Sequence, residues 1–323
     1  MHWVCLPPTT WPPLTPTPTP WQIHRLVQSL TRTPDPDDPH RTPELINQAR
    51  NHAATHLNTA LPQNWRDPAT WPTWRALLPH IDALANHASP DTDTATTESY
   101  LTATGLFLND QGSTGRAITY LERALAIAER VLGQDYRGIL ESRHNLAYAY
   151  ASAGLMDRAV PLYERTLKDS VRVLGRDHPQ TLLLRSNLAG AYEKWGNLDR
   201  AIPLHEQTLK DRERVLGQDH PHTLASRTNL AFAYASAGNL DRVIPLQELA
   251  LKNSVRVLGQ DHLQTVRAQN NLAHVYVLAG NWDRAIHLYE QTLEGSARML
   301  GEDHPMTKTV RANLATMLRR RGH

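Results

Sequence analysis

The sequence contains a single cysteine, no long apolar run and almost no net charge. The lone cysteine, Cys5, excludes a disulfide within the chain and is typical of proteins of the reducing cytosol. No stretch approaches the roughly 18 consecutive apolar residues that span a bilayer. Residues 1–22 lack the basic start and apolar core of a secretory signal, and they are rich in proline and threonine. We therefore predict a cytoplasmic protein without a membrane partner and with a disordered arm over residues 1–22.

The charges nearly cancel, because 34 Lys and Arg residues stand against 32 Asp and Glu residues, a net charge of +2 at pH 7. Such a chain is not attracted as a whole to a polyanion, so we expect no nucleic-acid partner. Glycine and runs of β-branched residues are also sparse. The composition therefore favours an all-α fold.

What the sequence does contain is a repeat of 42 residues. The motif RVLGQDH stands at residues 214–220, and close copies place its glycine at Gly133, Gly175, Gly217, Gly259 and Gly301. The triplet NLA keeps the same step, as do one arginine (Arg116, Arg158, Arg200, Arg242, Arg284) and one glutamate (Glu122, Glu164, Glu206, Glu248, Glu290). A period of this length predicts a solenoid in which each unit buries its apolar face against the next.

One unit, residues 179–219, is predicted to be a helical hairpin. Its first segment, PQTLLLRSNLAGAYEKWG, has one apolar stripe, made by Leu184, Leu188, Ala189 and Tyr192. Its second segment begins with Asn197 or Asp199 as a cap and has an inner side of Ala201, Leu204, Thr208, Leu209 and Val215. Counting on gives five hairpins that end near Gly301. A final single helix follows, and Arg319, Arg320 and Arg321 keep its open side polar.

The Asp-His pair in each copy of the motif could be a catalytic or metal-binding device, but helix capping explains it better. The glycine ends one helix, Asp219 or His220 caps the next, and Pro221 occupies its first position. The copies lie one per unit, and the first has Tyr136 in place of histidine. No zinc-type Cys/His spacing occurs either. We therefore expect no catalytic activity, no metal, no cofactor and no small-molecule substrate.

The hairpin phrases resemble a known family. The pattern NLA..Y...G in the first helix, with an Ala, an aromatic and a Thr in the second, is similar to tetratricopeptide repeats, and LG.DHP.T between units is similar to the kinesin-light-chain subtype. The resemblance covers residues 95–323, within a predicted repeat domain of residues 91–323. It implies a right-handed α-solenoid of five hairpins plus a capping helix. It also implies a non-enzymatic scaffold that binds a protein or peptide partner.

The segment upstream has another resemblance. Helices are predicted from residue 44 to about residue 59 and within DPATWPTWRALLPHIDALANHA. Together with IHRLVQSLTR at residues 23–32, they resemble the region that joins the nucleotide-binding part of bacterial NB-ARC (STAND) signalling ATPases to their repeat arm. We predict a helical adaptor over residues 23–90. No G-x-x-x-x-G-K-[ST] phosphate loop occurs. The chain is thus either an adaptor that acts alone or the sensor arm of such an ATPase.

The candidate binding residues lie on the first helix of each unit. Five asparagines stand in register there: Asn145, Asn187, Asn229, Asn271 and Asn313. In kinesin light chain the matching asparagine contacts peptide ligands, and the amide can donate to and accept from a ligand backbone. Alternatively, each asparagine bonds a neighbouring helix and fixes the stacking.

Other residues on the same face vary from unit to unit, as expected of a surface tuned to one partner. Tyr148, Phe232, Asn270 and His274 are candidate contacts, and Arg267 is the main basic residue before the final helix. One basic residue is too few to clamp a C-terminal carboxylate, so we expect an extended internal segment as ligand. Four arginines precede the asparagines by two positions: Arg143, Arg185, Arg227 and Arg311. They either bind an acidic motif of the partner or lie along the seam, the line of contact between neighbouring helices. In the second case the aliphatic part of each side chain is packed and its guanidinium group is solvated.

Overall fold

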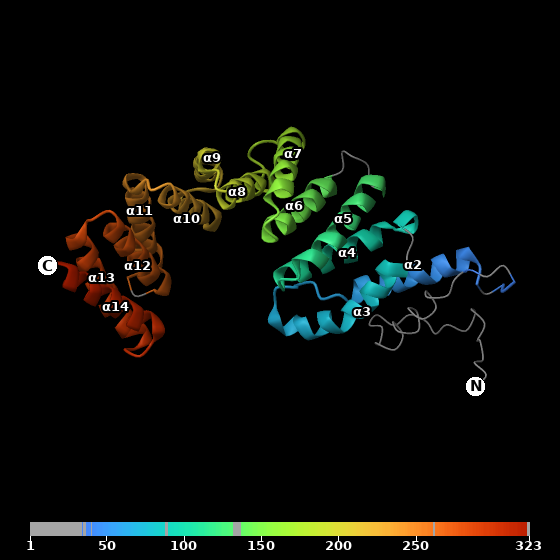
Figure 1. Cartoon of the computed structure of the whole chain (residues 1–323), viewed down its shortest axis with the longest axis horizontal. Helices are drawn as coiled ribbons and strands as arrows, with labels where there is room; N and C mark the ends of the chain where they lie inside the picture. The colour runs from blue at the N-terminus through green and yellow to red at the C-terminus, as the bar shows by residue number, and fades with distance from the viewer. Residues whose placement is uncertain are drawn as a thin grey trace. The chain divides into compact units, whose positions relative to one another are not determined.

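The computed structural model describes residues 34, 37–39, 41–87, 90–131, 137–260 and 262–321, and this part of the chain forms 13 α-helices and no strand (Figure 1). The helices are α2 (Pro43–Ala60), α3 (Trp71–His87), α4 (Ala95–Asp110), α5 (Thr114–Val131), α6 (Arg137–Ser152), α7 (Met156–Leu174), α8 (Pro179–Lys194), α9 (Leu198–Leu216), α10 (Pro221–Ser236), α11 (Leu240–Leu258), α12 (Leu263–Leu278), α13 (Trp282–Leu300) and α14 (Pro305–Arg321). The all-α prediction is confirmed. The predicted arm over residues 1–22, the segment 23–32 of the predicted adaptor and residues 132–136 of the first copy of the repeated motif lie outside the described residues.

The chain divides into two compact units, residues 1–162 and residues 163–323, and the division falls inside α7. In the first unit the hairpin α2–α3 packs on α4, and α5 packs on both α4 and α6 (Figure 1). On α3 the side chains of Trp74, Leu77, Ile81 and Leu84 are buried in this core, and Trp71 and Leu78 are partly buried against it. Trp74 stacks on Phe107 of α4 with ring centroids 4.8 Å apart. The segment upstream of the repeats therefore shares one hydrophobic core with the first repeat.

In the second unit each helix from α8 to α14 packs against the next one. The first helices of the hairpins begin at Pro179, Pro221 and Leu263, and the final single helix α14 begins at Pro305. The structural period therefore equals the sequence period of 42 residues. The predicted apolar stripe of α8 is buried throughout. The prediction for α9 is wrong at its end: Val215 is exposed, because the buried stripe of this helix ends one turn earlier, at Arg212.

The histidine of the repeated motif is the helix cap. The Nδ1 atoms of His178, His220, His262 and His304 each accept a hydrogen bond, of 3.1–3.2 Å, from the backbone N–H two residues on. The aspartate has a different role, since Asp177 and Asp219 pair with Arg214 and Arg256 at the end of the following second helix. The motif thus combines a cap for the next helix with an ion pair between its aspartate and the arginine of the following copy of the motif. Gly217 takes φ +88°, a value that side chains rarely allow.

A tyrosine, a glutamate and an arginine join successive hairpins, and we call this set the Tyr–Glu–Arg triad. In the first instance the Tyr150 hydroxyl donates to Glu122 over 2.6 Å, and Arg158 pairs with the same carboxylate over 3.0 Å. The guanidinium also lies 4.3 Å from the tyrosine ring centroid. Burial, and then the bond to Glu122, raise the pKa of Tyr150 to about 12, so the hydroxyl remains a donor.

The same triad recurs at the same step in the second unit, as Tyr192–Glu164–Arg200, Tyr234–Glu206–Arg242 and Tyr276–Glu248–Arg284. The arginine and the glutamate that mark the repeat in the sequence are therefore its two charged members. In the last position of the series Leu318 replaces the tyrosine.

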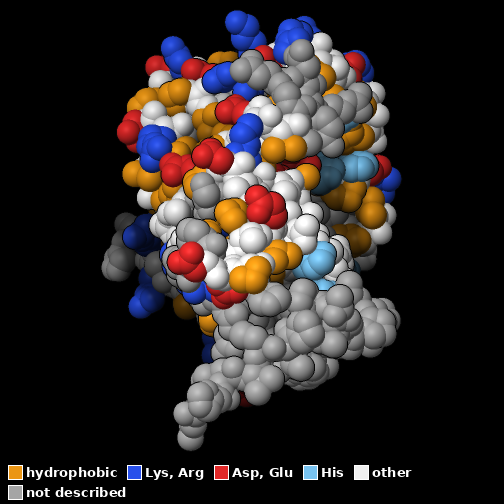
Figure 2. Space-filling model, turned by 90° about the vertical axis from the view of Figure 1, so that its right-hand side faces the viewer, with side chains coloured by type: hydrophobic (Ala, Val, Ile, Leu, Met, Phe, Trp, Pro, Cys, Tyr) orange, Lys and Arg blue, Asp and Glu red, His pale blue; other side chains and the backbone are white. Residues whose placement is uncertain are grey.

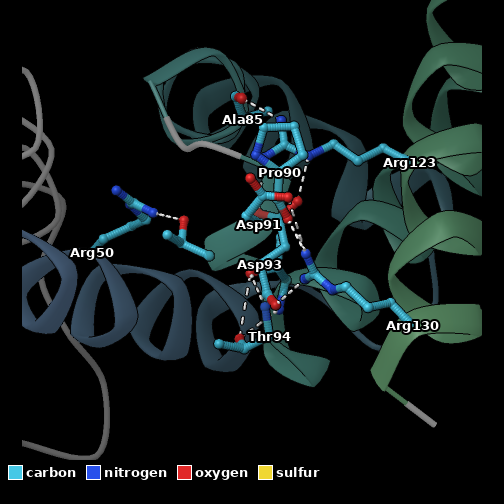
Figure 3. A network of polar contacts seen from close by, with 10 residues as sticks. Arg50, Ala85, Pro90, Asp91, Asp93, Thr94, Arg123 and Arg130 are labelled. Carbon is cyan, nitrogen blue, oxygen red and sulfur yellow. Dashed lines mark hydrogen bonds and ion pairs between the residues drawn. The ribbon is translucent and has the colours of Figure 1, made fainter.

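In the first unit a polar network holds the connection between α3 and α4 (Figure 3). The buried carboxylate of Asp93 accepts from Nε and Nη2 of Arg123 on α5, over 2.7 and 2.8 Å. Arg130 lies about two helical turns after Arg123 on α5. It donates to the backbone carbonyls of Pro90 and Asp93, each over 2.6 Å. The two arginines of α5 therefore fix a connection that has little apolar content of its own.

Replacing Asp93 is expected to destabilise the first unit strongly. In Asp93→Ala the Arg123 guanidinium loses a buried bidentate partner, a change that typically costs about 3–5 kcal/mol. The matched control is Asp91→Ala, two residues away, because the Asp91 side chain is 97% exposed and lies 4.0 Å from Arg130. That change should cost less than about 1 kcal/mol. Chemical denaturation followed by circular dichroism measures both, and equal losses in the two variants would contradict a stabilising role of the Asp93–Arg123 ion pair.

One buried histidine in the second unit should make stability depend on pH. His205 of α9 lies with Nε2 3.4 Å from the Glu193 carboxylate and close to Arg212. Burial, with a smaller effect of Arg212, lowers the pKa of His205 to about 4. The contact with Glu193 is therefore not an ion pair at neutral pH. Burial also raises the pKa of Glu193.

Because a histidine in an unfolded chain has a pKa of about 6.5, the unfolded state takes up the proton first as pH falls. The contribution of His205 is complete above pH 6.5 and is lost towards pH 4. His205→Tyr introduces the residue found at the equivalent positions 163 and 289, so we expect a shallower fall of the denaturation midpoint between pH 6.5 and 4.5. The control is His287→Gln, at an exposed histidine of α13. An unchanged slope in His205→Tyr would show that this residue is not the sensor.

Candidate peptide-binding face

The first helices of the second unit expose one stripe each, which we call the first-helix face. Its members recur every three or four residues and so lie on one side of their helix. Four positions per helix make up the face: Leu183, Asn187, Gly190 and Lys194 on α8; Ala225, Asn229, Phe232 and Ser236 on α10; Arg267, Asn271, His274 and Leu278 on α12. In the first unit Asn145 and Tyr148 hold the matching positions on α6.

The amides of the repeated asparagines make no hydrogen bond within the described part of the chain. Asn229 and Asn271 are exposed, Asn187 and Asn313 are half-buried, and Asn145 is buried with its Nδ2 unpartnered. An interhelix bond that fixes the stacking is thus not formed by any of the five among the described residues. The amides of Asn187, Asn229, Asn271 and Asn313 therefore keep donors and an acceptor for another molecule.

The variable residues that the sequence singled out lie at neighbouring positions of the same helices. Phe232 is 65% exposed and Tyr148 is 40% exposed, while His274 and Arg267 are exposed as well. Asn270 is half-buried, and its Oδ1 atom has no partner. Gly190 leaves open space, because a Cβ atom built there would meet nothing within 4 Å. Along the second unit the face therefore presents a glycine on α8, an exposed aromatic ring on α10 and polar side chains on α12.

The arginines two positions before the asparagines do not behave as predicted. Their stems lie at the seam, but three of the guanidinium groups are buried and paired rather than solvated. The pairs are Arg143–Glu129 at 2.9 Å, Arg185–Asp211 at 2.5 Å and Arg227–Glu213 at 2.9 Å. Only Arg311, which pairs with Glu302, keeps an exposed head among the four. The prediction of solvated guanidinium groups was wrong because each of the three carboxylates lies on a second helix, which the pattern along the first helix does not reveal.

The fifth repeat differs in a way that fits these ion pairs. Gln269 stands there at the position of Arg227, and Val255, on the second helix of the fourth repeat, stands at the position of Glu213. Both members of the ion pair are thus replaced together, which leaves neither charge buried alone. In the second repeat Val171 stands at the glutamate position, and Arg185 takes Asp211 instead.

The described residues contain no group of three His, Cys, Asp or Glu side chains that could hold a metal ion. Within this same part of the chain, none of the helices combines the length and apolarity needed to cross a bilayer. On the face shown in Figure 2, acidic and basic side chains are intermixed with hydrophobic ones. The pattern agrees with a net charge of only +2.

Comparison with protein families gives one match, which covers most of the chain. A model of the tetratricopeptide repeat family matches residues 93–170, 142–214, 186–254, 223–298 and 264–323. These overlapping segments run from the start of the first hairpin to the end of the chain. No curated protein matches the sequence.

Several solved structures are similar. The nearly identical TPR-like repeats of a kinesin-light-chain-like protein from Podospora anserina share 27% identity over 64% of this chain and 99% of that one, with a TM-score of 0.60. BtubC (BKLC) from P. vanneervenii shares 22% identity over 88% and 94% of the two chains, with a TM-score of 0.54.

A signal transduction ATPase with numerous domains and a tetratricopeptide repeat sensor, from Pyrococcus horikoshii, is 12% identical and has a TM-score of 0.62. The match covers 87% of this chain and 42% of that protein. The two likenesses below 25% identity show the fold alone.

Replacing Glu213 tests how much the Arg227–Glu213 ion pair contributes to stability. In Glu213→Ala the buried guanidinium of Arg227 loses its carboxylate, and we expect a loss of about 3–5 kcal/mol in the free energy of unfolding. The double variant Glu213→Val with Arg227→Gln copies Val255 and Gln269, at the junction of the fourth and fifth repeats, and should recover most of that loss. Denaturation midpoints measure both. A double variant no more stable than Glu213→Ala would show that the ion pair is not the cause.

Proposed function

The chain belongs to the tetratricopeptide repeat family, and from this premise we propose that its first-helix face binds an extended segment of a partner protein. The chain would then act as a scaffold. The observation that supports the proposal is the row of asparagine amides without hydrogen-bond partners on successive first helices. Asparagine is a poor helix former, and in the described structure no hydrogen bond of its side chain offsets this low helix propensity.

A ligand backbone offers the missing partners. An extended peptide has free N–H and C=O groups along its whole length, and one amide side chain can donate to a carbonyl and accept from an N–H. The exposed Phe232 and Tyr148 add rigid aromatic area, which is typical of residues that anchor a partner. The backbone bonds would supply affinity for any extended segment, and the variable side chains would supply specificity.

Replacing three asparagines tests the proposal. In Asn187→Ala with Asn229→Ala and Asn271→Ala, stability should stay the same or rise, because no hydrogen bond is lost and alanine favours helices. Partners captured from lysate by the unaltered chain should be identified, and their affinity for the variant should fall at least about tenfold, as three lost hydrogen bonds of about 0.5–1.5 kcal/mol each predict.

A matched control exists in the turns of the same hairpins. Asn239 and Asn281 also recur at the repeat step, are exposed, and make no capping bond through their side chains. The variant Asn239→Ala with Asn281→Ala should bind the partners normally. Undiminished binding by the folded triple variant would refute the role of the first-helix face.

A second candidate function is the sensor arm of a nucleotide-dependent signalling ATPase of the STAND class. The observation that favours it is the hairpin α2–α3, which carries the phrase WPTWRALLPH and shares a core with the first repeat. Immunoblotting of the native cells with an antibody against the repeats distinguishes the two. A band much larger than 36.4 kDa, with a phosphate loop in its upstream sequence, is expected for the sensor arm. A band at 36.4 kDa would contradict it.

A further inference from the structure

The contact between α9 and α10 contains two buried arginines and one carboxylate. Arg227 of α10 is 1% exposed and pairs with Glu213 of α9. Arg212 of α9 is 5% exposed, and within the described part of the chain it donates to neutral groups alone: Ser226 Oγ over 2.7 Å, and the backbone carbonyls of His222 and Leu182 over 3.1 and 3.5 Å. Burial lowers the pKa of Arg212. A buried cation is costly unless a negative charge lies nearby, so an anion is expected here.

Differences between two repeats create this excess of positive charge. Three positions around α10 differ from the positions one repeat earlier, around α8: Arg212 replaces Ser170, Glu213 replaces Val171 and Asn253 replaces Asp211. Around α8 the buried Arg185 is balanced by Asp211. Around α10 the carboxylate of Glu213 faces two arginines. The net difference is one positive charge, which a single monovalent anion balances.

The same differences leave three buried residues with unused donors. Around α8 the hydroxyl of Thr181 is bonded to that of Ser170 over 2.7 Å, and Arg185 Nη1 donates to Asp211 over 2.5 Å. Around α10 four atoms have no hydrogen-bond partner among the described residues: Thr223 Oγ1, Arg227 Nε and Nη1, and Asn253 Nδ2. These three residues are 0%, 1% and 8% exposed. Buried donors of this kind are nearly always bonded to some acceptor.

The repeat and the observed contacts bring these donors together. Thr223 and Arg227 are four residues apart and lie on the same side of α10. From α9, Arg212 contacts the residue next to each of them. Asn253 lies on α11, which packs on α10, at the position from which the aspartate of the preceding repeat reaches its arginine. Donors that face one another cannot bond to each other, but one shared acceptor satisfies them all.

We propose that a small monovalent anion of the size of chloride binds between α9, α10 and α11. Thr223 Oγ1, Arg227 Nε and Nη1, and Asn253 Nδ2 donate to it, and its charge balances that of Arg212. Chloride accepts hydrogen bonds from several N–H and O–H groups at once. The burial of the donors argues against a larger ligand such as a phosphate ester or a peptide carboxylate. None of these residues belongs to the first-helix face, so the site is independent of the proposed function.

The anion joins two repeats, because α9 belongs to the third and α10 and α11 to the fourth. A ligand that binds the folded state alone stabilises it by mass action, so chloride should stabilise the chain. Urea denaturation of the whole chain tests this, since urea adds no anion. Replacing sodium gluconate at about 150 mM by sodium chloride at the same concentration should lower the unfolding equilibrium constant about tenfold, as a dissociation constant of about 15 mM predicts.

Two substitutions remove the site in different ways. Asn253→Asp supplies Arg227 with the carboxylate found in the preceding repeat, and Arg212→Ser removes the excess charge and restores a serine beside Thr223. Each should abolish the response to chloride. The control is Asn239→Asp, the same substitution at an exposed position before the first turn of α11, and it should keep the full response. A crystal grown in sodium bromide should show anomalous density between Arg227 and Asn253.

Three results would overturn the proposal. Equal unfolding constants of the unaltered chain in chloride and gluconate would show that the donors bind no anion. A chloride response that persists in both Asn253→Asp and Arg212→Ser would show a general effect of the salt. Bromide density at other places alone would put the anion outside this site. Loss of the response in the two variants, with its retention in Asn239→Asp, would establish the anion site.

Discussion

The carboxylate that each hairpin offers to its neighbour is the interaction on which the rest of the structure depends. A tetratricopeptide unit buries an apolar stripe, but such stripes alone would allow adjacent hairpins to slide. Glu122, Glu164, Glu206 and Glu248 prevent this by binding a tyrosine of the next first helix and an arginine of the next second helix at once. Two of the buried arginine pairs, Arg143–Glu129 and Arg227–Glu213, add a second attachment between successive hairpins, while Arg185–Asp211 joins the two helices of one hairpin. Geometry between hairpins is thus set by directional contacts.

The sequence predicted the hairpins well and their polar contacts poorly, for one physical reason. Helix limits follow from local signals, such as the histidine and proline that open α8 and the glycine that closes α9, and these operate within a few residues. The partner of a buried arginine lies on another helix, 14 residues away for Arg227 and 26 for Arg185. Periodicity along a single helix cannot reveal it. The joint change to Gln269 and Val255 was visible in the sequence and was the one available signal.

The candidate site was predicted in part. Sequence placed the asparagines and their variable neighbours on the first helix, and the structure shows most of them exposed or half-buried there. The sequence alone could not decide whether the asparagine amides form hydrogen bonds to neighbouring helices. The answer depends on the donors and acceptors of neighbouring helices, and within the described chain the Tyr–Glu–Arg triads and the seam pairs hold the stack without the asparagines. The scaffold and the proposed binding surface therefore draw on separate sets of residues, so substitutions on that surface need not cost the fold.

The Tyr–Glu–Arg triad also bears on how the chain folds. Its tyrosine and glutamate are 28 residues apart in every instance, and its arginine and glutamate are 36 apart. Each triad therefore spans less sequence than one 42-residue repeat. Contacts so close along the chain make loop closure cheap in entropy, and folding rates rise as contact order falls. A hairpin leaving the ribosome can attach to the one before it without waiting for the remainder of the chain, so the array can assemble in the order of its synthesis.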